Sequence, residues 1–320
     1  MAPDSMLTVL DAFDRERVVE LRAAGRFFWL DLLDPSDELL HDVSKCFGIH
    51  ELALEDAQKF GQRPKLDEYG DHVALVYFGI TDVGSIRTKV RIMEVHMFVH
   101  GDFVVTIHRE PWADFDRLRE TFARVPLGSE QLVVYRILDA LTDSWFPLVE
   151  RIDADIEQLE QAVVADPQPQ HIEQVMRLKR DLAFLRRTAG PLRDVAFGAS
   201  TRLLEIPGLE SGPRDYFRDV HDHMIRIDRS LETSRVLLSD VMSVHAARVA
   251  QGQSRSTERL TVVSTIFLPL SFVVGFFGQN FRWMVDQVST RHDFLVFGVG
   301  GLLVSLVLLA PIIRGSLVNQ

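Results

Sequence analysis

The residues best suited to chemistry form a short polar turn, Gly278-Gln279-Asn280, at the end of an uncharged run over residues 260–279. The two carboxamide side chains offer neutral oxygens, and glycine allows backbone carbonyls to turn toward a ligand. Neutral oxygens suit a hydrated cation such as Mg²⁺, which gives up its water reluctantly. Taken alone, the three residues are equally typical of a polar turn that caps a helix.

A face of small side chains leads back from this turn along the same segment. At alternating intervals of three and four residues, every position except Leu268 and Asp240 is small or carries a hydroxyl. A repeat of 3.5 residues indicates several parallel helices around a common axis. This small-residue seam comprises Gly278, Gly275, Ser271, Leu268, Ser264, Thr261, Thr257, Ser254, Ala250, Ala247, Ser243 and Asp240.

The seam has two possible explanations. Small residues also let two membrane helices pack closely against each other. The seam, however, continues for several turns before the uncharged run begins, where packing within lipid has no role. We therefore predict a narrow path with an apolar constriction at Leu268, because pores gate and select at such constrictions and at oxygen-lined filters. The predicted pore-lining residues are Gly275, Ser271, Leu268, Ser264, Thr261 and Thr257.

Two membrane helices and a long stalk must position these residues. About 20 uncharged residues suffice to cross the ~30 Å hydrocarbon layer, and no helix breaker lies between Pro213 and Pro269. We predict one helix over about 214–279, with its stalk at 214–259 and its membrane part at 260–280. An external loop (281–293), a second membrane helix (294–313) and a cytosolic tail (314–320) follow. Two membrane helices cannot enclose a path as a single copy, so we expect a homo-oligomer.

The chain before the stalk predicts an α+β cytosolic domain over 1–128, an α/β/α sandwich with a central sheet. Runs rich in β-branched and aromatic residues predict strands at 6–10, 27–33, 72–80, 90–101 and 102–108, with Gly101-Asp102 as a hairpin turn. Helices are predicted at 36–47, 50–57 and 111–124. A cytosolic helical bundle is predicted over 129–213, with helices at 131–164, 169–188 and 192–204, because apolar residues recur there at helical spacing.

Composition limits the classes of function. The net charge of −11 disfavours nucleic acid as a partner, because phosphate binding needs clustered Lys and Arg. The lone Cys46 excludes an internal disulfide. No phosphate-binding glycine loop, nucleophile elbow or metalloprotease helix occurs, so we predict no enzyme. We interpret His96, His100 and His108, on predicted strands, as core or rim residues.

Arginines indicate the orientation in the membrane. Arg248, Arg255 and Arg259 precede the first apolar run, and the N-terminus lacks a basic-then-apolar leader. Because positive residues favour the cytoplasmic side, we expect an inner (plasma) membrane protein with both termini in the cytoplasm.

The window PLSFVVGFFGQNF, residues 269–281, resembles the end of the first membrane helix in the CorA family of divalent-cation transporters. The family signature there is Gly-Met-Asn, preceded by this Pro/Gly pattern and followed by one more span. Residues 57–69, AQKFGQRPKLDEY, are similar to the segment before a central strand of the family's cytosolic domain.

The resemblance implies a funnel-shaped homopentamer in the lipid bilayer that lets Mg²⁺, and also Co²⁺ or Ni²⁺, enter the cell. It implies no covalently bound cofactor; the divalent cation is both substrate and regulatory ligand. By position, Gly278 and Asn280 form the outer selectivity ring, and Gly275, Ser271 and Leu268 fall on pore-lining positions.

Two departures from the family pattern leave the metal open. Gln279 replaces the usual methionine, and the loop over 281–293 lacks the family's Met-Pro-Glu sequence, with Asp286 as an acid near that mouth. The ZntB branch, which has altered loops, resembles zinc transporters, so proton-coupled Zn²⁺ transport is one alternative. A membrane-anchored cytosolic sensor or scaffold is the second, although an anchor needs no small-residue seam.

Family members sense cytosolic Mg²⁺ through carboxylates between subunits, one of them on the stalk helix. Here Asp215, Asp219 and His223 follow one another at intervals of four residues on one stalk face. Groups at that spacing can share a divalent ion across a subunit boundary, and Asp240 lies on the seam itself. A solvated, salt-bridged helix face is the alternative interpretation.

Overall fold

The computed structural model describes residues 7–83, 90–124, 129–206, 215–279, 282, 286, 290–304 and 307. The chain forms two compact units, Met1–Met242 and Ser243–Gln320, and each is described by itself. The finer domain limits proposed from the sequence stay predictions.

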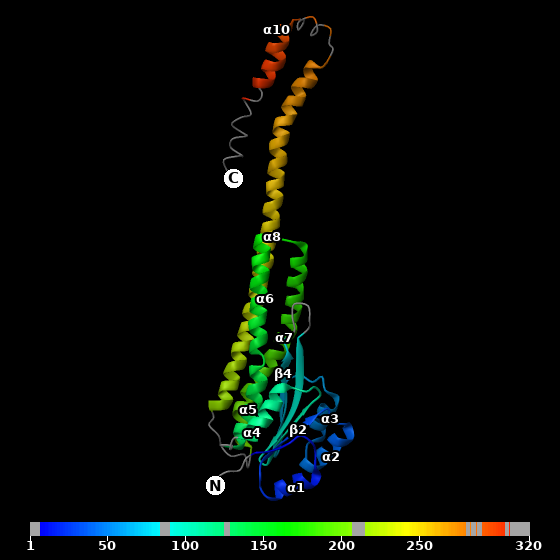
Figure 1. The fold of residues 1–320 in the computed structure, drawn as a ribbon, viewed down its shortest axis with the longest axis vertical. Helices are drawn as coiled ribbons and strands as arrows, with labels where there is room; N and C mark the ends of the chain where they lie inside the picture. The colour runs from blue at the N-terminus through cyan, green and yellow to red at the C-terminus, as the bar shows by residue number, and fades with distance from the viewer. Residues whose placement is uncertain are drawn as a thin grey trace. The chain divides into compact units, whose positions relative to one another are not determined.

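A six-stranded mixed sheet forms the centre of the first unit (Figure 1). Its spatial order is β1-β2-β6-β5-β4-β3; β1, β2 and β6 are parallel, and the other neighbours are antiparallel. Gly101-Asp102 joins β5 to β6 as a hairpin, as predicted. The strands are β1 (Thr8–Leu10), β2 (Phe28–Leu33), β3 (Lys65–Tyr69), β4 (His72–Asp82), β5 (Arg91–His100) and β6 (Phe103–His108). Strand β3 was missed because its sequence, KLDEY, is mostly charged.

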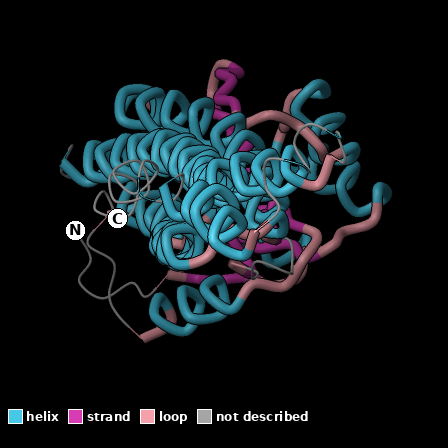
Figure 2. The backbone as a smooth tube through the Cα atoms, turned by 90° about the horizontal axis from the view of Figure 1, so that it is seen from above, coloured by secondary structure: helices cyan, strands magenta, loops and turns pink. Residues whose placement is uncertain are grey.

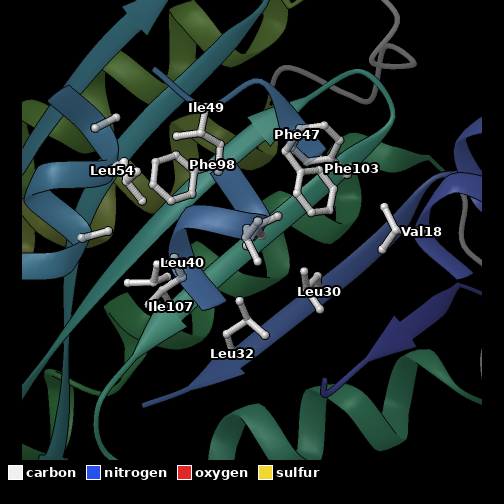
Figure 3. Close-up of a cluster of buried hydrophobic side chains, with 14 of the residues drawn as sticks. Val18, Leu30, Leu32, Leu40, Phe47, Ile49, Leu54, Phe98, Phe103 and Ile107 are labelled. Atoms are coloured by element: carbon white, nitrogen blue, oxygen red, sulfur yellow. The ribbon is translucent and has the colours of Figure 1, made fainter. Parts of the chain in front are cut away.

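Three short helices cover one face of this sheet: α1 (Arg15–Ala23), α2 (Asp37–Phe47) and α3 (Glu51–Lys59). Alternate residues of β2 point to that face, so Phe28, Leu30 and Leu32 enter one core cluster with Phe47 of α2. Figure 3 shows this cluster between the helices and the strands. Ser36 caps α2, its hydroxyl accepting a hydrogen bond from the Leu39 amide at 3.2 Å.

Helices α4 (Ala113–Phe122) and α5 (Glu130–Asp143) cover the opposite face. Trp29 of β2 points there and meets Phe115 of α4 edge to face, with ring centroids 5.7 Å apart. The Tyr77 hydroxyl of β4 lies 2.8 Å from the Thr142 hydroxyl of α5. Helices therefore lie on both sides of the strands (Figure 2), and the predicted α/β/α sandwich is confirmed.

The predicted helix over 131–164 is wrong, because it is two helices: α5 ends at Asp143, and α6 (Phe146–Ala165) begins after a short turn. Pro147 cannot donate a backbone hydrogen bond and stands in the first turn of α6. The turn instead binds β4, because the Ser144 hydroxyl accepts from the Ile80 amide at 2.8 Å and the Trp145 indole donates to the Phe78 carbonyl at 3.0 Å.

The predicted break at Gly190-Pro191 is also wrong. Helix α7 (Pro169–Arg202) runs through Pro191 and ends in a 3₁₀ turn, η1 (Leu203–Glu205). An internal proline costs about 3 kcal/mol. The neighbouring Ala189 and Leu192 are fully buried, and burial of one large apolar side chain contributes about 1.5–3 kcal/mol. Packing on both sides of the proline therefore keeps the helix continuous.

Helix α8 spans Asp215–Phe277, in agreement with the single helix predicted over about 214–279. In the first unit, its buried positions recur at intervals of three and four residues, which is the spacing of a coiled-coil seam. Three contacts tie this part of α8 to its neighbours. Ser234 Oγ donates to Asp153 Oδ1 of α6 at 2.7 Å. Beside the buried stripe, Asp228 and Glu232 pair with Arg193 and Arg186 of α7 at 2.9 and 2.6 Å. The stripe is Phe217, Val220, Met224, Ile227, Leu231, Ser234, Leu238 and Val241.

The second unit contains the rest of α8, the short helix α10 (Arg291–Asp293) and a π-helical stretch, η2 (Phe294–Val299). Among the described residues, α8 alone is long and apolar enough to cross a membrane. Of the second span predicted at 294–313, residues 294–304 and 307 are described and helical, and the remainder lies outside the described residues.

Candidate ion path and cytosolic metal cluster

The small-residue seam of α8 is open along its whole length in the single chain. All twelve seam residues, from Asp240 to Gly278, are exposed. Leu268, the predicted constriction, is the most exposed large apolar residue in the described part of the chain, at 76%. An apolar side chain exposed to water lacks the stabilisation that burial would give it.

Partly covered residues of α8 between 257 and 276 lie on the other side of the helix. They are Val262, Thr265, Ile266, Pro269, Leu270 and Val273. At 100° per residue, their mean direction lies about 150° around the helix from the seam between Thr257 and Ser271. Contacts within the chain therefore cover one face of the helix and leave the seam free.

The polar turn at the end of α8 is partly described. The Gly278 amide donates to the Val274 carbonyl at 2.9 Å, and the Gln279 amide donates to the Phe276 carbonyl at 3.3 Å, so the helix closes here. A Cβ at Gly278 would stand 3.0 Å from the Val274 carbonyl oxygen, which explains glycine at this position. Asn280, the principal predicted filter residue, lies outside the described residues.

A different arrangement of ionisable groups lies in the first unit, where α5 meets α8. His223 of α8 stands between two carboxylates: its Nδ1 is 3.1 Å from Asp143 Oδ1 of α5, and its Nε2 is 3.5 Å from Asp219 Oδ1. One ligand atom each from Asp139, Asp143 and His223 lie within 4.8 Å of one another. We call Asp139, Asp143, Asp219 and His223 the stalk-base cluster.

The dimensions of this cluster are slightly wider than those of an occupied divalent-cation site. Mg²⁺ binds oxygen at about 2.1 Å, so two ligand atoms on one ion lie at most about 4.2 Å apart. The observed spread of 4.8 Å exceeds this by about 0.6 Å, which rotation of an exposed carboxylate can close. Burial, and then the charge of Asp143, raise the pKa of Asp139. A bound cation would offset both of these effects on the pKa of Asp139.

The structure brings together two of the four predicted regulatory residues. Asp219 and His223 are in the cluster, whereas the Asp215 carboxylate pairs with Arg218 at 2.8 Å. Asp240 lies 17 residues beyond His223, about 26 Å along the helix, too far to share an ion with it in one chain. Asp139 and Asp143 were not among the predicted residues, although their spacing of four residues places both on one face of α5.

The buried histidines on the sheet have structural roles, as expected. His108 Nε2 is 3.1 Å from the buried Asp31 carboxylate, which also accepts hydrogen bonds from Arg119 of α4 at 2.6 Å and from Thr106 at 2.5 Å. His96 Nε2 is 2.8 Å from Glu94. Buried polar groups in native proteins are hydrogen-bonded in this way, and the contacts of Asp31 join β2, β6 and α4.

The chain combines a mixed-sheet domain, a helical bundle and a long helix, and this helix ends in an uncharged apolar segment with an open polar face. This combination, together with the family match, identifies a membrane ion transporter rather than an enzyme. Residues 24–314 match the family model described as CorA-like Mg²⁺ transporter protein, and the chain belongs to that family.

Two relatives match this chain over most of their length. The chain is 31% identical to the cobalt/magnesium transport protein CorA of Thermotoga maritima over 279 residues, which cover 85% of this chain and 78% of the relative. It is 29% identical to the putative metal ion transporter YfjQ of Bacillus subtilis, over 88% of this chain and 86% of the relative.

Solved structures share the fold. The complete structure of the CorA magnesium transporter from Methanocaldococcus jannaschii superposes with a TM-score of 0.73 at 20% identity, covering 90% of each chain. The cytoplasmic domain of ZntB from Vibrio parahaemolyticus gives a TM-score of 0.58 at 11% identity over 70% of this chain and 88% of that one. At such identities the likeness concerns the fold alone, and the predicted fold is confirmed.

Proposed function

We propose that several copies of this chain assemble around the small-residue seam and transport Mg²⁺, and also Co²⁺ or Ni²⁺, into the cytoplasm across the inner (plasma) membrane. The proposal adds three points to the family membership: which metal ions are transported, in which direction, and along which path. Cobalt and magnesium appear in the name of the Thermotoga maritima relative, which covers most of this chain. A pentamer with both termini in the cytoplasm is the assembly that the family resemblance implies.

The observation that supports the path most directly is the open seam. Between residues 262 and 273, contacts within the chain cover the opposite face of α8, while the seam residues from Asp240 to Gly278 stay exposed at the 3.5-residue repeat. Helices that meet around such a seam are parallel and share an axis. Copies of α8 arranged in this way would surround a path lined by the hydroxyls and backbone of Ser271, Ser264, Thr261 and Thr257, with Gly275 where the helices come closest.

Two points along this path would control the ion. A ring of Leu268 side chains forms an apolar constriction that opposes passage of a hydrated cation when it closes. Gly278, Gln279 and Asn280 supply amide and carbonyl oxygens at the outer mouth, where the ion is held with its water. The loop residue Asp286, which is exposed, adds negative charge near that mouth.

Regulation is proposed at the stalk-base cluster and, on the seam, at Asp240. A cytosolic divalent ion held by Asp219 and His223 of α8 together with Asp139 and Asp143 of α5 would fix the stalk to the helical bundle. Loss of the ion leaves three carboxylates facing one another, so their repulsion loosens the contact and favours opening. Asp215, which is paired with Arg218, stays a predicted member of the same site.

Flux through proteoliposomes tests the proposed function. The full chain is reconstituted and supplied in turn with Mg²⁺, Co²⁺, Ni²⁺ and Zn²⁺, with and without a proton gradient. We expect Mg²⁺ and Co²⁺ flux without a gradient and a large loss of flux in Asn280→Ala. The matched control is Asn319→Ala, a carboxamide in the predicted cytosolic tail, which should transport as the wild type does.

Other outcomes assign other functions. Flux of Zn²⁺ alone, and only with a proton gradient, would support the zinc-transporter alternative. Absence of flux for every ion would support a membrane-anchored sensor. An Asn280→Ala variant with wild-type flux would remove the carboxamide ring from the selectivity filter.

A further inference from the structure

Three arginines of α8 in the second unit take no part in the proposed path. The side chains of Arg248, Arg255 and Arg259 are exposed, and none of the ion pairs found among the described residues involves them. Glu258 is the one acidic residue between 243 and 279, so this part of the helix is basic in a chain with a net charge of −11. Three exposed cations without a carboxylate partner suggest an external anionic partner.

The three arginines share one face of the helix. At 100° per residue, Arg248 and Arg259 lie about 20° and 40° from Arg255, so the three guanidinium groups form one stripe. The seam residues from Ala247 to Thr261 centre about 140° away from this stripe. If the seam faces the axis of an assembly, as the proposed function requires, the arginine stripe faces outward.

The stripe also stands at the depth of lipid headgroups. Arg259 precedes Gly278 by 19 residues, about 29 Å of helix, which matches the ~30 Å thickness of the hydrocarbon layer. Along the helix toward its N-terminus, Arg255 lies about 6 Å from Arg259, which is one turn, and Arg248 lies about 16 Å from Arg259. Arginine can extend its aliphatic part along apolar surface while its charged end reaches the interface.

We propose that Arg255 and Arg259 bind the headgroups of anionic phospholipids in the cytoplasmic leaflet, with a weaker contribution from Arg248. This inference rests on the proposed function, because the outward direction and the depth both assume a membrane-spanning α8 around a seam. The partner is a lipid surface with phosphate-bearing, negatively charged headgroups. Guanidinium groups bind phosphate through paired hydrogen bonds.

The depth of each arginine sets the size of its effect. A basic residue at an anionic membrane surface strengthens binding on the order of fivefold, and the attraction decays over a Debye length of about 8 Å at physiological salt. Arg255 and Arg259 lie within that distance of the headgroups. Arg248, about 16 Å from Arg259, lies beyond it. We therefore expect Arg259 and Arg255 to contribute much more to the affinity for anionic lipid than Arg248 does.

Calorimetric titration of the full chain in a neutral detergent tests this inference. The ligands are short-chain phosphatidylglycerol, the same-length phosphatidylcholine and inorganic phosphate. We expect phosphatidylglycerol to bind preferentially, Arg255→Gln/Arg259→Gln to lower its affinity on the order of 25-fold, and Arg248→Gln to lower it less than twofold. The control is Arg235→Gln on the same helix, whose guanidinium pairs with Glu232 at 2.7 Å and which should leave lipid affinity unchanged.

Each contrary outcome has a distinct meaning. Equal binding of the two lipids, or an unchanged affinity in Arg255→Gln/Arg259→Gln, would overturn the proposal, as would phosphate binding as tightly as the anionic lipid. A change of oligomer size in this variant, with its lipid preference intact, would assign the arginines to contacts between copies. Flotation with liposomes separates the two proposals: preference for anionic lipid without ion flux refutes the transport function alone, whereas failure to enter the bilayer refutes both.

Discussion

Substitution of Asp143 by asparagine separates a metal-binding role of the stalk-base cluster from a structural one. The change keeps the shape of the side chain and removes one negative charge from a group whose ligand atoms lie within 4.8 Å of one another. A cation present at 100 times its Kd stabilises the folded state by about 2.7 kcal/mol. For a unit the size of Met1–Met242 this corresponds to a rise in Tm of about 5–11 °C.

The variant should lose a defined part of that rise. A tenfold weaker affinity, our expectation for the loss of one anionic ligand, reduces the stabilisation by about 1.4 kcal/mol, or about 3–6 °C in Tm. Without metal, the substitution has two opposing effects. It removes repulsion with Asp139, and it removes the charge 3.1 Å from His223, so the Tm of the metal-free protein should change less than the metal-dependent shift.

The assay is thermal unfolding of the full chain in detergent, with Mg²⁺ titrated against a chelated sample. The matched control is Asp181→Asn, an exposed residue of α7 outside the cluster, which should show the full shift. If Asp143→Asn also retains the full Mg²⁺ shift, the cluster is a network of ion pairs and our reasoning about its charge is wrong. His223→Ala should weaken stabilisation by Co²⁺ more than by Mg²⁺, because imidazole suits transition metals.

Three further predictions concern packing, gating and pH. Gly79→Ala places a Cβ 2.8 Å from Leu141 Cδ2 and should lower the free energy of unfolding by about 1–3 kcal/mol. Gly198→Ala, whose Cβ meets its nearest neighbour at 3.5 Å, should raise the free energy of unfolding by up to about 1 kcal/mol. Denaturant titration followed by tryptophan fluorescence measures both values. Leu268→Ser should raise resting Mg²⁺ flux in proteoliposomes when cytosolic-side Mg²⁺ is high, and an unchanged flux would remove the apolar constriction. The raised pKa of Asp139 means that the folded state holds this proton more tightly than the unfolded state, so its contribution to stability falls as pH rises from the ordinary value of 3.8 through the raised pKa. Asp139→Asn should therefore raise Tm at neutral pH without metal and have no effect below the ordinary pKa; a lower Tm at neutral pH would contradict this sign.

The sequence by itself determined the features that depend on local periodicity. The small-residue seam, the uncharged run to Gln279 and the continuity of α8 follow from residues three, four and seven apart, because a helix repeats at those intervals whatever it packs against. The strands of the sheet could likewise be predicted from short β-branched runs, except β3, whose polar residues form a strand through pairing with β4. The Gly-Gln-Asn turn and its preceding Pro/Gly pattern led to the correct family.

Tertiary structure decided what depends on partners distant in sequence. The chain turns between α5 and α6, just before Pro147, where Ser144 and Trp145 bind β4. Pro191 leaves α7 intact because its neighbours are buried. The two prolines look alike in sequence, and their packing differs. The stalk-base cluster depends on α5 and α8, whose residues Asp143 and His223 lie 80 positions apart. Spacing along one helix placed Asp219 beside His223, but only the packing of two helices could add Asp139 and Asp143.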